Sequence, residues 1–408
     1  MPAQVAVYQE VVAEVERITR PVGLRRTAVK RLALLVTGIL AAKSTVVAQV
    51  AAALFALDLT PAGKPESIGR RIRRALSDAR LDAETCYRPV LAAAIDWAAV
   101  LRGSKRVVLI VDESSKADDL HLFRLSLSYW GGSIPLAWSV WEQHVAMAAG
   151  RYWQQVDRVF DQVVTVLPAE LEVVVVADRA YDVPAFVDRV AARGWHWVVR
   201  VKANGTLRFL DHQGHNWSLK DLLHRRLRRG GRWKARGRVF QEAGWRDASI
   251  VGLWTPTAKE ALVVLSDLPC HWDVLCPYGQ RFWIEPSFRN DKSRGWQWED
   301  SQVQGLGHHQ RLLLAMAWAA LVTLSLGVQQ AKDRLAALAN RPTTDHPPKP
   351  QHPRESLFTL GLRAAQCWLA QKYSLHLYWP LPPLDTRSWH RIWLHAQADF
   401  FLFGTVRP

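Results

Sequence analysis

Two short apolar runs that each end in an aspartate constrain the fold of this chain more than any other feature. The runs are RVVLIVD, residues 106–112, and LEVVVVAD, residues 171–178. They predict buried strands, and an ionised carboxylate at such a place is costly unless it faces a cleft, a partner or a metal. In an open α/β sheet the cleft lies at the carboxyl ends of the strands, where Asp112 and Asp178 would meet. Position alone favours a more modest interpretation, in which each aspartate is a turn residue or a helix cap.

The chain divides into five segments around these runs. Residues 1–104 are predicted to be helical, because apolar residues recur at three- and four-residue spacing. Residues 105–204 hold both aspartate strands, an alternating strand pair around a Gly-Gly turn, and helices, which predicts an α/β fold with a mixed sheet. Residues 205–276 are expected to form a basic, β-rich insertion, and residues 277–340 a second, helical part of the core. Residues 341–408 contain a Pro-rich linker, a final helix and a tail.

Basic residues outnumber acidic residues in this chain. There are 53 Lys and Arg against 37 Asp and Glu, a formal net charge of +16. Such an excess favours a polyanionic partner, usually nucleic acid and otherwise an anionic membrane. A predicted helix that contains Arg70, Arg71, Arg73 and Arg74 concentrates the charge, as does the run at residues 224–238. The residues alone leave open whether the helix is a solvated face or a DNA-binding one.

The cysteines and the apolar stretches exclude some classes of protein. Four cysteines are scattered without a Cys-x-x-Cys pair, which argues against a disulfide framework or a zinc site and fits a reducing cytoplasm. The first residues lack the basic region of a signal peptide. Residues 312–328 are apolar but fall short of a full membrane span, so a buried core helix is the expected structure.

Two other acids near the aspartates are weaker candidates for chemistry. Glu113 is expected on the opposite face of its strand from Asp112, because successive side chains alternate. Asp182 precedes the predicted helix VPAFVDRVAARG, where a helix cap is expected.

A third acidic position, Glu285, lies in the segment YGQRFWIEPSFRNDK. Tyr278, Arg281, Glu285 and Lys292 are separated there by two, three and six residues. On an ideal helix these four side chains fall within roughly 60° of one another. A carboxylate beside two cations suits a metal ligand flanked by phosphate-binding groups, although an ordinary exposed face with an Arg–Glu pair has the same pattern. Pro286 is tolerated only in a first helical turn, which predicts a helix start near residues 283–286 with Tyr278 and Arg281 on the approach to it.

Taken together, these residues resemble the DDE transposases of bacterial insertion sequences. The resemblance rests on Asp112 after RVVLIV, Asp178 in ADRAYD, and Glu285 within Y-x2-R-x3-E-x6-K, the signature of one subgroup. It covers residues 105–305 and implies a ribonuclease H-like core interrupted by a β-rich insertion. The 106 residues between Asp178 and Glu285 leave room for that insertion.

The resemblance implies an activity and a set of site residues. Asp112, Asp178 and Glu285 would be catalytic and would hold two Mg²⁺ or Mn²⁺ ions for in-line attack on a phosphodiester. Tyr278, Arg281 and Lys292 would contact phosphates at the transposon end. The expected partners are the double-stranded DNA of the inverted-repeat ends and of the target, and a second copy of the chain in a homodimer.

Two further cations, Arg200 and Lys202, leave the strand after the second motif and are expected to face DNA. The chain departs from the family pattern at Ser114, Ala180 and Pro286, and none of these differences removes a predicted ligand. Three alternatives stay open: a ribonuclease H-like nuclease without strand transfer, a non-catalytic DNA-binding derivative of a transposase, and a basic membrane-associated protein. If the chain is a transposase, as the resemblance implies, it is expected in the bacterial cytoplasm, at the nucleoid.

Overall fold

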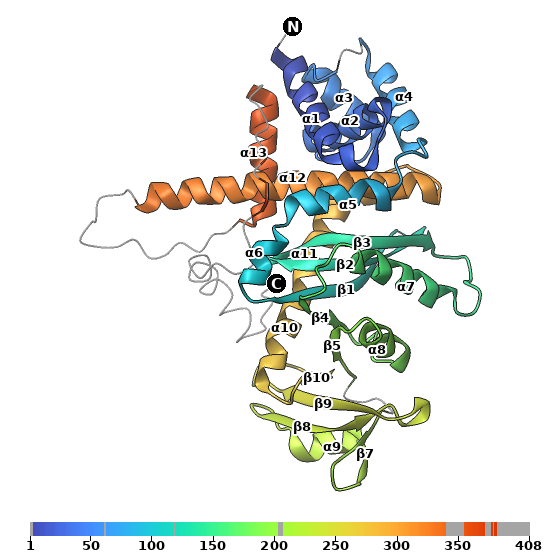
Figure 1. Cartoon of the computed structure of the whole chain (residues 1–408), viewed down its shortest axis with the longest axis vertical. Helices are drawn as coiled ribbons and strands as arrows, with labels where there is room; N and C mark the ends of the chain where they lie inside the picture. Colours follow the sequence, from blue (N-terminus) through green and yellow to red (C-terminus); the bar gives the residue numbers. More distant parts are fainter. Residues whose placement is uncertain are drawn as a thin grey trace.

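The computed structural model describes residues 3–60, 63–117, 119–202, 207–339, 355–371, 377 and 379–381. Its N-terminal part is helical, as the sequence predicts, and most of it lies at the top of Figure 1. The α-helices there are α1 (Ala3–Thr19), α2 (Arg26–Ala42), α3 (Val47–Ala56), α4 (Pro65–Leu76), α5 (Ala83–Ala94) and α6 (Trp97–Arg102). Helix α2 is buried over most of its length and forms the centre of this group. Asp82 and Asp96 fix where α5 and α6 begin, because their carboxylates accept hydrogen bonds from backbone N–H groups of the first turn.

A mixed sheet follows the N-terminal helices. Its first strands are β1 (Arg106–Lys116), β2 (Leu120–Tyr129), β3 (Gly132–Glu142), β4 (Glu172–Ala177) and β5 (His196–Arg200). They lie in the order β3-β2-β1-β4-β5, with β1 antiparallel to β2 and parallel to β4, and β4 parallel to β5. A three-stranded meander continued by parallel strands, each reached through a helix, is a ribonuclease H-like arrangement. The connecting helices are α7 (Arg151–Val164) and α8 (Pro184–Ala191).

The insertion extends this sheet instead of forming a detached unit. Its elements are β6 (Arg208–Leu210), β7 (Asn216–Ser218), α9 (Leu219–Arg226), β8 (Arg232–Val239), β9 (Arg246–Leu253) and β10 (Leu262–Ser266). Strand β10 pairs antiparallel with β5, and the order continues as β10-β9-β8-β6-β7, which gives ten strands among the described residues. One continuous hydrogen-bonded surface therefore connects the aspartate strands to the basic run of the insertion.

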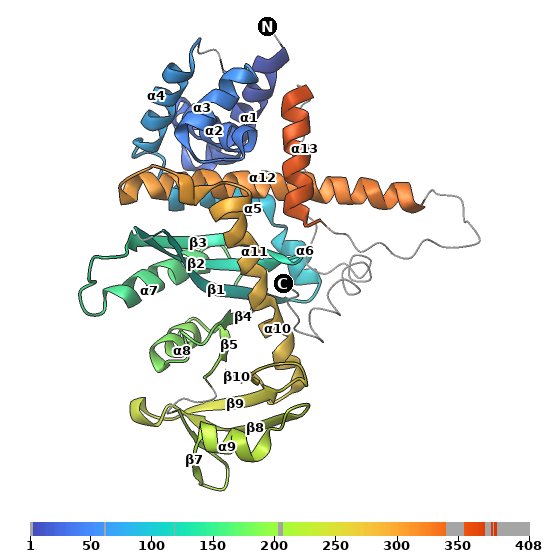
Figure 2. The ribbon, with the colours of Figure 1, turned by 180° about the vertical axis from the view of Figure 1, so that it is seen from behind.

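The chain then crosses the sheet in a succession of short helical turns, visible from behind in Figure 2. They are α10 (Leu275–Gly279), the 3₁₀ turn η4 (Gln280–Trp283), α11 (Ile284–Arg289) and the π-helical turn η5 (Asn290–Arg294). The long helix α12 (Leu306–Ala339) and α13 (Leu357–Gln371) complete the described fold. Other 3₁₀ turns are η1 (Arg20–Val22), η2 (Gln241–Ala243), η3 (Trp272–Val274) and η6 (Trp298–Asp300).

Helix α12 contains the apolar stretch at residues 312–328. Among the described helices it is long and apolar enough to cross a membrane, but 83% of its most apolar window is buried inside the protein. It runs between the N-terminal helices and the sheet, as Figure 1 shows. The expectation of a buried core helix is confirmed for this segment.

Two local expectations are wrong. Strand β1 does not end at Asp112 but continues to Lys116, because its second half stays paired with β2 after the pairing with β4 has stopped at Ile110. Asp182 does not cap α8, which begins at Pro184 after Val183 and has no side-chain cap. The Asp182 carboxylate instead accepts a hydrogen bond from the backbone N–H of Lys202, at 3.5 Å.

Candidate active site

Asp112 and Asp178 come together through strand register. Ile110 pairs with Val176, so the residues two positions further on, Asp112 and Asp178, project from the same face of the sheet. The pairing of β1 with β4 ends before these aspartates, and β4 itself ends at Ala177. The two carboxylates therefore meet where parallel strands part, as the sequence predicts.

Glu285 reaches this place from the helical segment that crosses the same face. Pro286 lies in the first turn of α11, where its missing N–H costs no helical hydrogen bond. The preceding turns of α10 and η4 hold Tyr278 and Arg281, so the predicted helix start near residue 283 is confirmed. Arg281 and Glu285 lie four residues apart and form an ion pair with Nη1 and Oε1 at 2.6 Å.

Arg281 contacts all three carboxylates. Its Nη2 lies 3.2 Å from Oδ2 of Asp112 and 3.6 Å from Oδ2 of Asp178, while Nη1 pairs with Glu285. Only 11% of the Arg281 side chain is exposed. One guanidinium thus joins three acidic residues from three distant parts of the chain.

The electrostatics of the site follow from burial and from crowding of like charges. Burial raises the pKa of Asp112 to about 6; Arg281 opposes this rise and Asp178 adds to it. Burial acts to lower the pKa of Arg281, but Asp112 and Asp178 outweigh it and the pKa is raised. Burial also raises the pKa of the Tyr278 phenol to about 12, although Arg200 and Arg281 act against it. Burial and the nearby charge of Asp178 therefore disfavour the ionised form of Asp112, and the adjacent Arg281 favours it.

The remaining predicted cations lie around this centre. Lys292 does not join the carboxylates: its Nζ lies 3.3 Å from Oε1 of Glu299, and the π-helical turn that contains it breaks the ideal helical spacing on which the prediction relied. Arg200 forms an ion pair with Glu260. Lys202 follows β5 and its side chain is exposed. The roles predicted for Tyr278, Arg281, Lys292, Arg200 and Lys202 in DNA binding stay predictions.

The donor set suits divalent ions. Three carboxylates offer the hard oxygen ligands that Mg²⁺ and Mn²⁺ prefer. In the described part of the chain, no three His, Cys, Asp or Glu side chains are arranged to hold an ion as they stand, and the Arg281 head group lies beside all three acids. All three nevertheless face one cationic position, so these residues fit divalent ions once that head group moves aside.

Sequence reasoning missed the groups that support the site. Arg124 is paired in register with Asp112 and is buried, and it binds Asp291 of the crossing segment. On the other face, Glu113 accepts hydrogen bonds from the phenols of Tyr152 at 2.6 Å and Tyr181 at 3.2 Å. The signal available for Arg124 in the sequence was a charged residue within the largely apolar strand segment HLFRLSLSYW.

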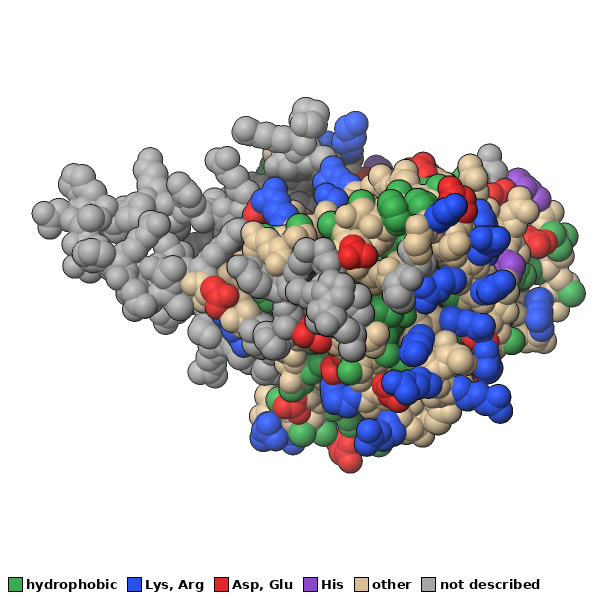
Figure 3. All heavy atoms as spheres, turned by 90° about the horizontal axis from the view of Figure 1, so that it is seen from above, with side chains coloured by type: hydrophobic (Ala, Val, Ile, Leu, Met, Phe, Trp, Pro, Cys, Tyr) green, Lys and Arg blue, Asp and Glu red, His purple; other side chains and the backbone are tan. Residues whose placement is uncertain are grey.

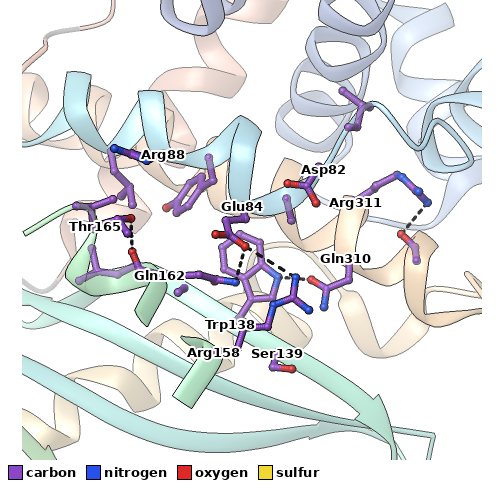
Figure 4. Close-up of a pocket in the computed structure, with 18 of the residues that line it drawn as sticks. Asp82, Glu84, Arg88, Trp138, Ser139, Arg158, Gln162, Thr165, Gln310 and Arg311 are labelled. Atoms are coloured by element: carbon purple, nitrogen blue, oxygen red, sulfur yellow. Dashed lines mark hydrogen bonds and ion pairs between the residues drawn. The ribbon is translucent and has the colours of Figure 1, made fainter. Parts of the chain in front are cut away.

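A cavity of about 250 Å³ lies away from the carboxylates, between α5, β3, α7 and α12 (Figure 4). Gln162 donates to Glu84 at 2.9 Å, and the indole N–H of Trp138 donates to Gln310 at 3.0 Å. Asp112, Asp178 and Glu285 do not line it. It marks the junction between the N-terminal helices and the sheet.

Comparison with known proteins supports an assignment. Residues 153–322, which include Asp178 and Glu285, match the family described as the transposase DDE domain. No curated protein matches the sequence. Among solved structures, a cryo-EM structure of a piggyBac transposase synaptic complex with hairpin DNA is similar, with 9% identity, a TM-score of 0.41, and coverage of 90% of this chain and 77% of that chain. The match of residues 153–322 to a transposase DDE domain supports an enzyme that cleaves and transfers DNA.

Proposed function

We propose that this transposase moves a bacterial insertion sequence by cut-and-paste transposition and belongs to the subgroup with the Tyr-Arg-Glu-Lys signature. The observation that carries the proposal is the convergence of Asp112, Asp178 and Glu285 on one cationic position. Two Mg²⁺ or Mn²⁺ ions held by these carboxylates would activate a water or 3′-hydroxyl and stabilise the leaving oxygen in a phosphodiester attack.

A row of residues in register links the carboxylates to the basic strand of the insertion. The register aligns Asp112, Asp178 and Arg200, then continues through Val264 of β10 and Val251 of β9 to Lys234 of β8. Five strand spacings separate β1 from β8, which amounts to about 24 Å. Val264 and Val251 are fully buried, so DNA that is cut at the carboxylates would meet the insertion at β8 and not along the strands between.

Strand β8 presents basic side chains along that face. Arg232, Lys234, Arg236 and Arg238 alternate along the strand and so point to the same side. Arg232 and Lys234 pack over the ring of Trp272, at 4.9 and 5.5 Å from its centre. Regularly spaced cations on an extended strand suit the repeated phosphates of a DNA backbone.

The N-terminal helices provide a second basic surface. Helix α4 buries Ile68 and Ile72 and exposes Arg70, Arg73 and Arg74. Figure 3 shows Lys and Arg side chains gathered on the right-hand part of the face seen from above. We propose that this surface binds the transposon end. A homodimer that pairs two ends, in the bacterial cytoplasm, is supported by the family resemblance.

The test is cleavage of a DNA fragment that carries the flanking sequences of the gene. The reaction is run with Mg²⁺, with EDTA, and with the variants Asp112→Ala and Asp119→Ala, the latter an exposed aspartate beyond the site. The proposal predicts cuts at the element boundary that need the metal and Asp112 but not Asp119, followed by joining to a target. Binding without cutting would mean a non-catalytic derivative, and cutting without joining would mean a nuclease.

A further inference from the structure

We infer that Arg281 is a placeholder cation for this site: its guanidinium neutralises the three carboxylates while no divalent ion is bound, and leaves that position when the ions and DNA enter. The inference rests on the proposed function, because it assumes that Asp112, Asp178 and Glu285 are the ligands of the ions.

The shape of the side chain suits the role. A guanidinium has five N–H donors in a rigid fork, and Arg281 directs its two terminal nitrogens to different acids, at 2.6 Å from Glu285 and 3.2 Å from Asp112. The third acid, Asp178, lies at 3.6 Å from the same Nη2. Without this charge, three carboxylates would lie close together, with Asp112 largely buried, which is unfavourable.

The position of Arg281 conflicts with bound ions. Carboxylate oxygens bind Mg²⁺ at about 2.0–2.1 Å, and the guanidinium occupies the space toward which those oxygens point. Two cations at one place also repel each other. The absence of a preformed three-ligand cluster among the described residues agrees with this competition. Ions can bind all three acids only after the Arg281 head group has moved.

A destination for the displaced side chain is at hand. Arg281 lies in the single 3₁₀ turn between α10 and α11, a kind of segment that often marks a hinge. Its Nε is buried and has no hydrogen-bond partner among the described residues, so the present position does not satisfy the group fully. A DNA phosphate near the cut can accept a forked pair of hydrogen bonds from it.

This exchange makes metal binding and DNA binding mutually favourable. Phosphate draws Arg281 away and frees the carboxylates, and by linkage bound ions raise the affinity for DNA by the same factor. The enzyme would then load its ions fully only when DNA is present. A cation that only flanks the site would lie farther from the ligands, so its removal would change the metal affinity of the DNA-free protein little.

The deciding experiment measures Mn²⁺ affinity of the full chain without DNA, by calorimetry or by electron spin resonance of the free ion. Arg281→Gln is expected to bind Mn²⁺ on the order of tenfold more tightly than the unsubstituted chain, because a competing charge is gone. Arg294→Gln is the matched control, since this arginine is exposed on the same segment, and the Mn²⁺ affinity of this variant should not change. Equal or weaker Mn²⁺ binding in Arg281→Gln would overturn the inference.

A second measurement covers the case in which Arg281→Gln does not fold. Duplex DNA of arbitrary sequence should tighten Mn²⁺ binding to the unsubstituted chain and to Arg294→Gln. The effect should be smaller in Arg281→Lys, whose ammonium group cannot form a forked pair of hydrogen bonds. No effect of DNA on the unsubstituted chain, or an equal effect in Arg281→Lys, would contradict the exchange. Asp112→Ala separates the failure of the proposed function from the failure of this inference. If Asp112→Ala binds Mn²⁺ as tightly as the unsubstituted chain, the proposed metal ligands are wrong. If Asp112→Ala loses Mn²⁺ binding but Arg281→Gln binds Mn²⁺ no more tightly than the unsubstituted chain, only the placeholder role of Arg281 is refuted.

Discussion

Arg124 and Asp291 form a buried ion pair that joins strand β2 to the helical segment carrying Glu285. Arg124 Nη1 donates to Asp291 Oδ2 at 2.5 Å, and the two residues are 3% and 8% exposed. The guanidinium also lies over the ring of Phe288, at 4.1 Å from its centre. Since Arg124 is the register partner of Asp112, this pair connects the first catalytic strand to the segment that supplies the third acid.

Breaking this pair on one side should be strongly destabilising. Asp291→Ala leaves the charge of Arg124 buried without its partner, which costs roughly 3–5 kcal/mol of unfolding free energy. The double variant Arg124→Met with Asp291→Leu removes both charges and should recover most of the loss. Urea denaturation measures both values. Glu14→Ala, which breaks an exposed pair with Arg17, is the control and should change stability by less than about 1 kcal/mol. A similarly small effect of Asp291→Ala would contradict this description of the pair.

The basic face of β8 should contribute to DNA affinity through phosphate contacts. Arg236→Gln combined with Arg238→Gln should weaken binding to DNA of any sequence, because both side chains are exposed. The slope of log affinity against log salt should fall by about 0.9 for each lost phosphate contact. Lys220→Gln alters an exposed lysine outside β8, on helix α9. The salt dependence of DNA binding by Lys220→Gln should match that of the unsubstituted chain. If the arginine double variant also keeps this salt dependence, β8 does not contact the DNA phosphates.

Stability should fall in mild acid because of His309. This histidine is 2% exposed, next to Trp298, and burial, followed by the charge of Lys116, lowers its pKa to about 4. Between pH 6.5 and 4 the unfolded chain binds a proton that the folded chain does not, so stability is lost as the pH falls, by up to about 3 kcal/mol. His309→Gln should flatten the dependence of unfolding free energy on pH in this window. His224→Gln, at an exposed position, should leave it unchanged, and an unaltered slope in His309→Gln would refute the assignment.

Much of the site was predictable because its signals are local. The aspartate strands follow from two short apolar runs, and their shared sheet edge follows from general topology. The turns before α11 follow from Pro286. The alternation along β1 predicts Glu113 on the far face, where it receives the phenols of Tyr152 and Tyr181.

The features that the sequence could not predict depend on contacts between distant residues. The pairing of β10 with β5, which makes one sheet of the core and the insertion, has no local signal. Ideal helical spacing predicts Lys292 beside Glu285, but a π-helical turn and Glu299 direct it elsewhere. The position of Arg281 among three acids depends on where β1, β4 and α11 meet.

The central claim is that Asp112, Asp178 and Glu285 act as one catalytic unit. The most direct measurement is the single-turnover rate of DNA cleavage for Asp112→Asn, Asp178→Asn, Glu285→Gln and the triple variant, with Asp182→Asn as the control. Each single variant should lose on the order of a thousandfold or more, and the triple variant should lose little beyond that, because residues that act as a unit are not additive. Cleavage by Asp182→Asn should be nearly unchanged. A single variant that keeps most of its rate, or losses that multiply in the triple variant, would contradict the account.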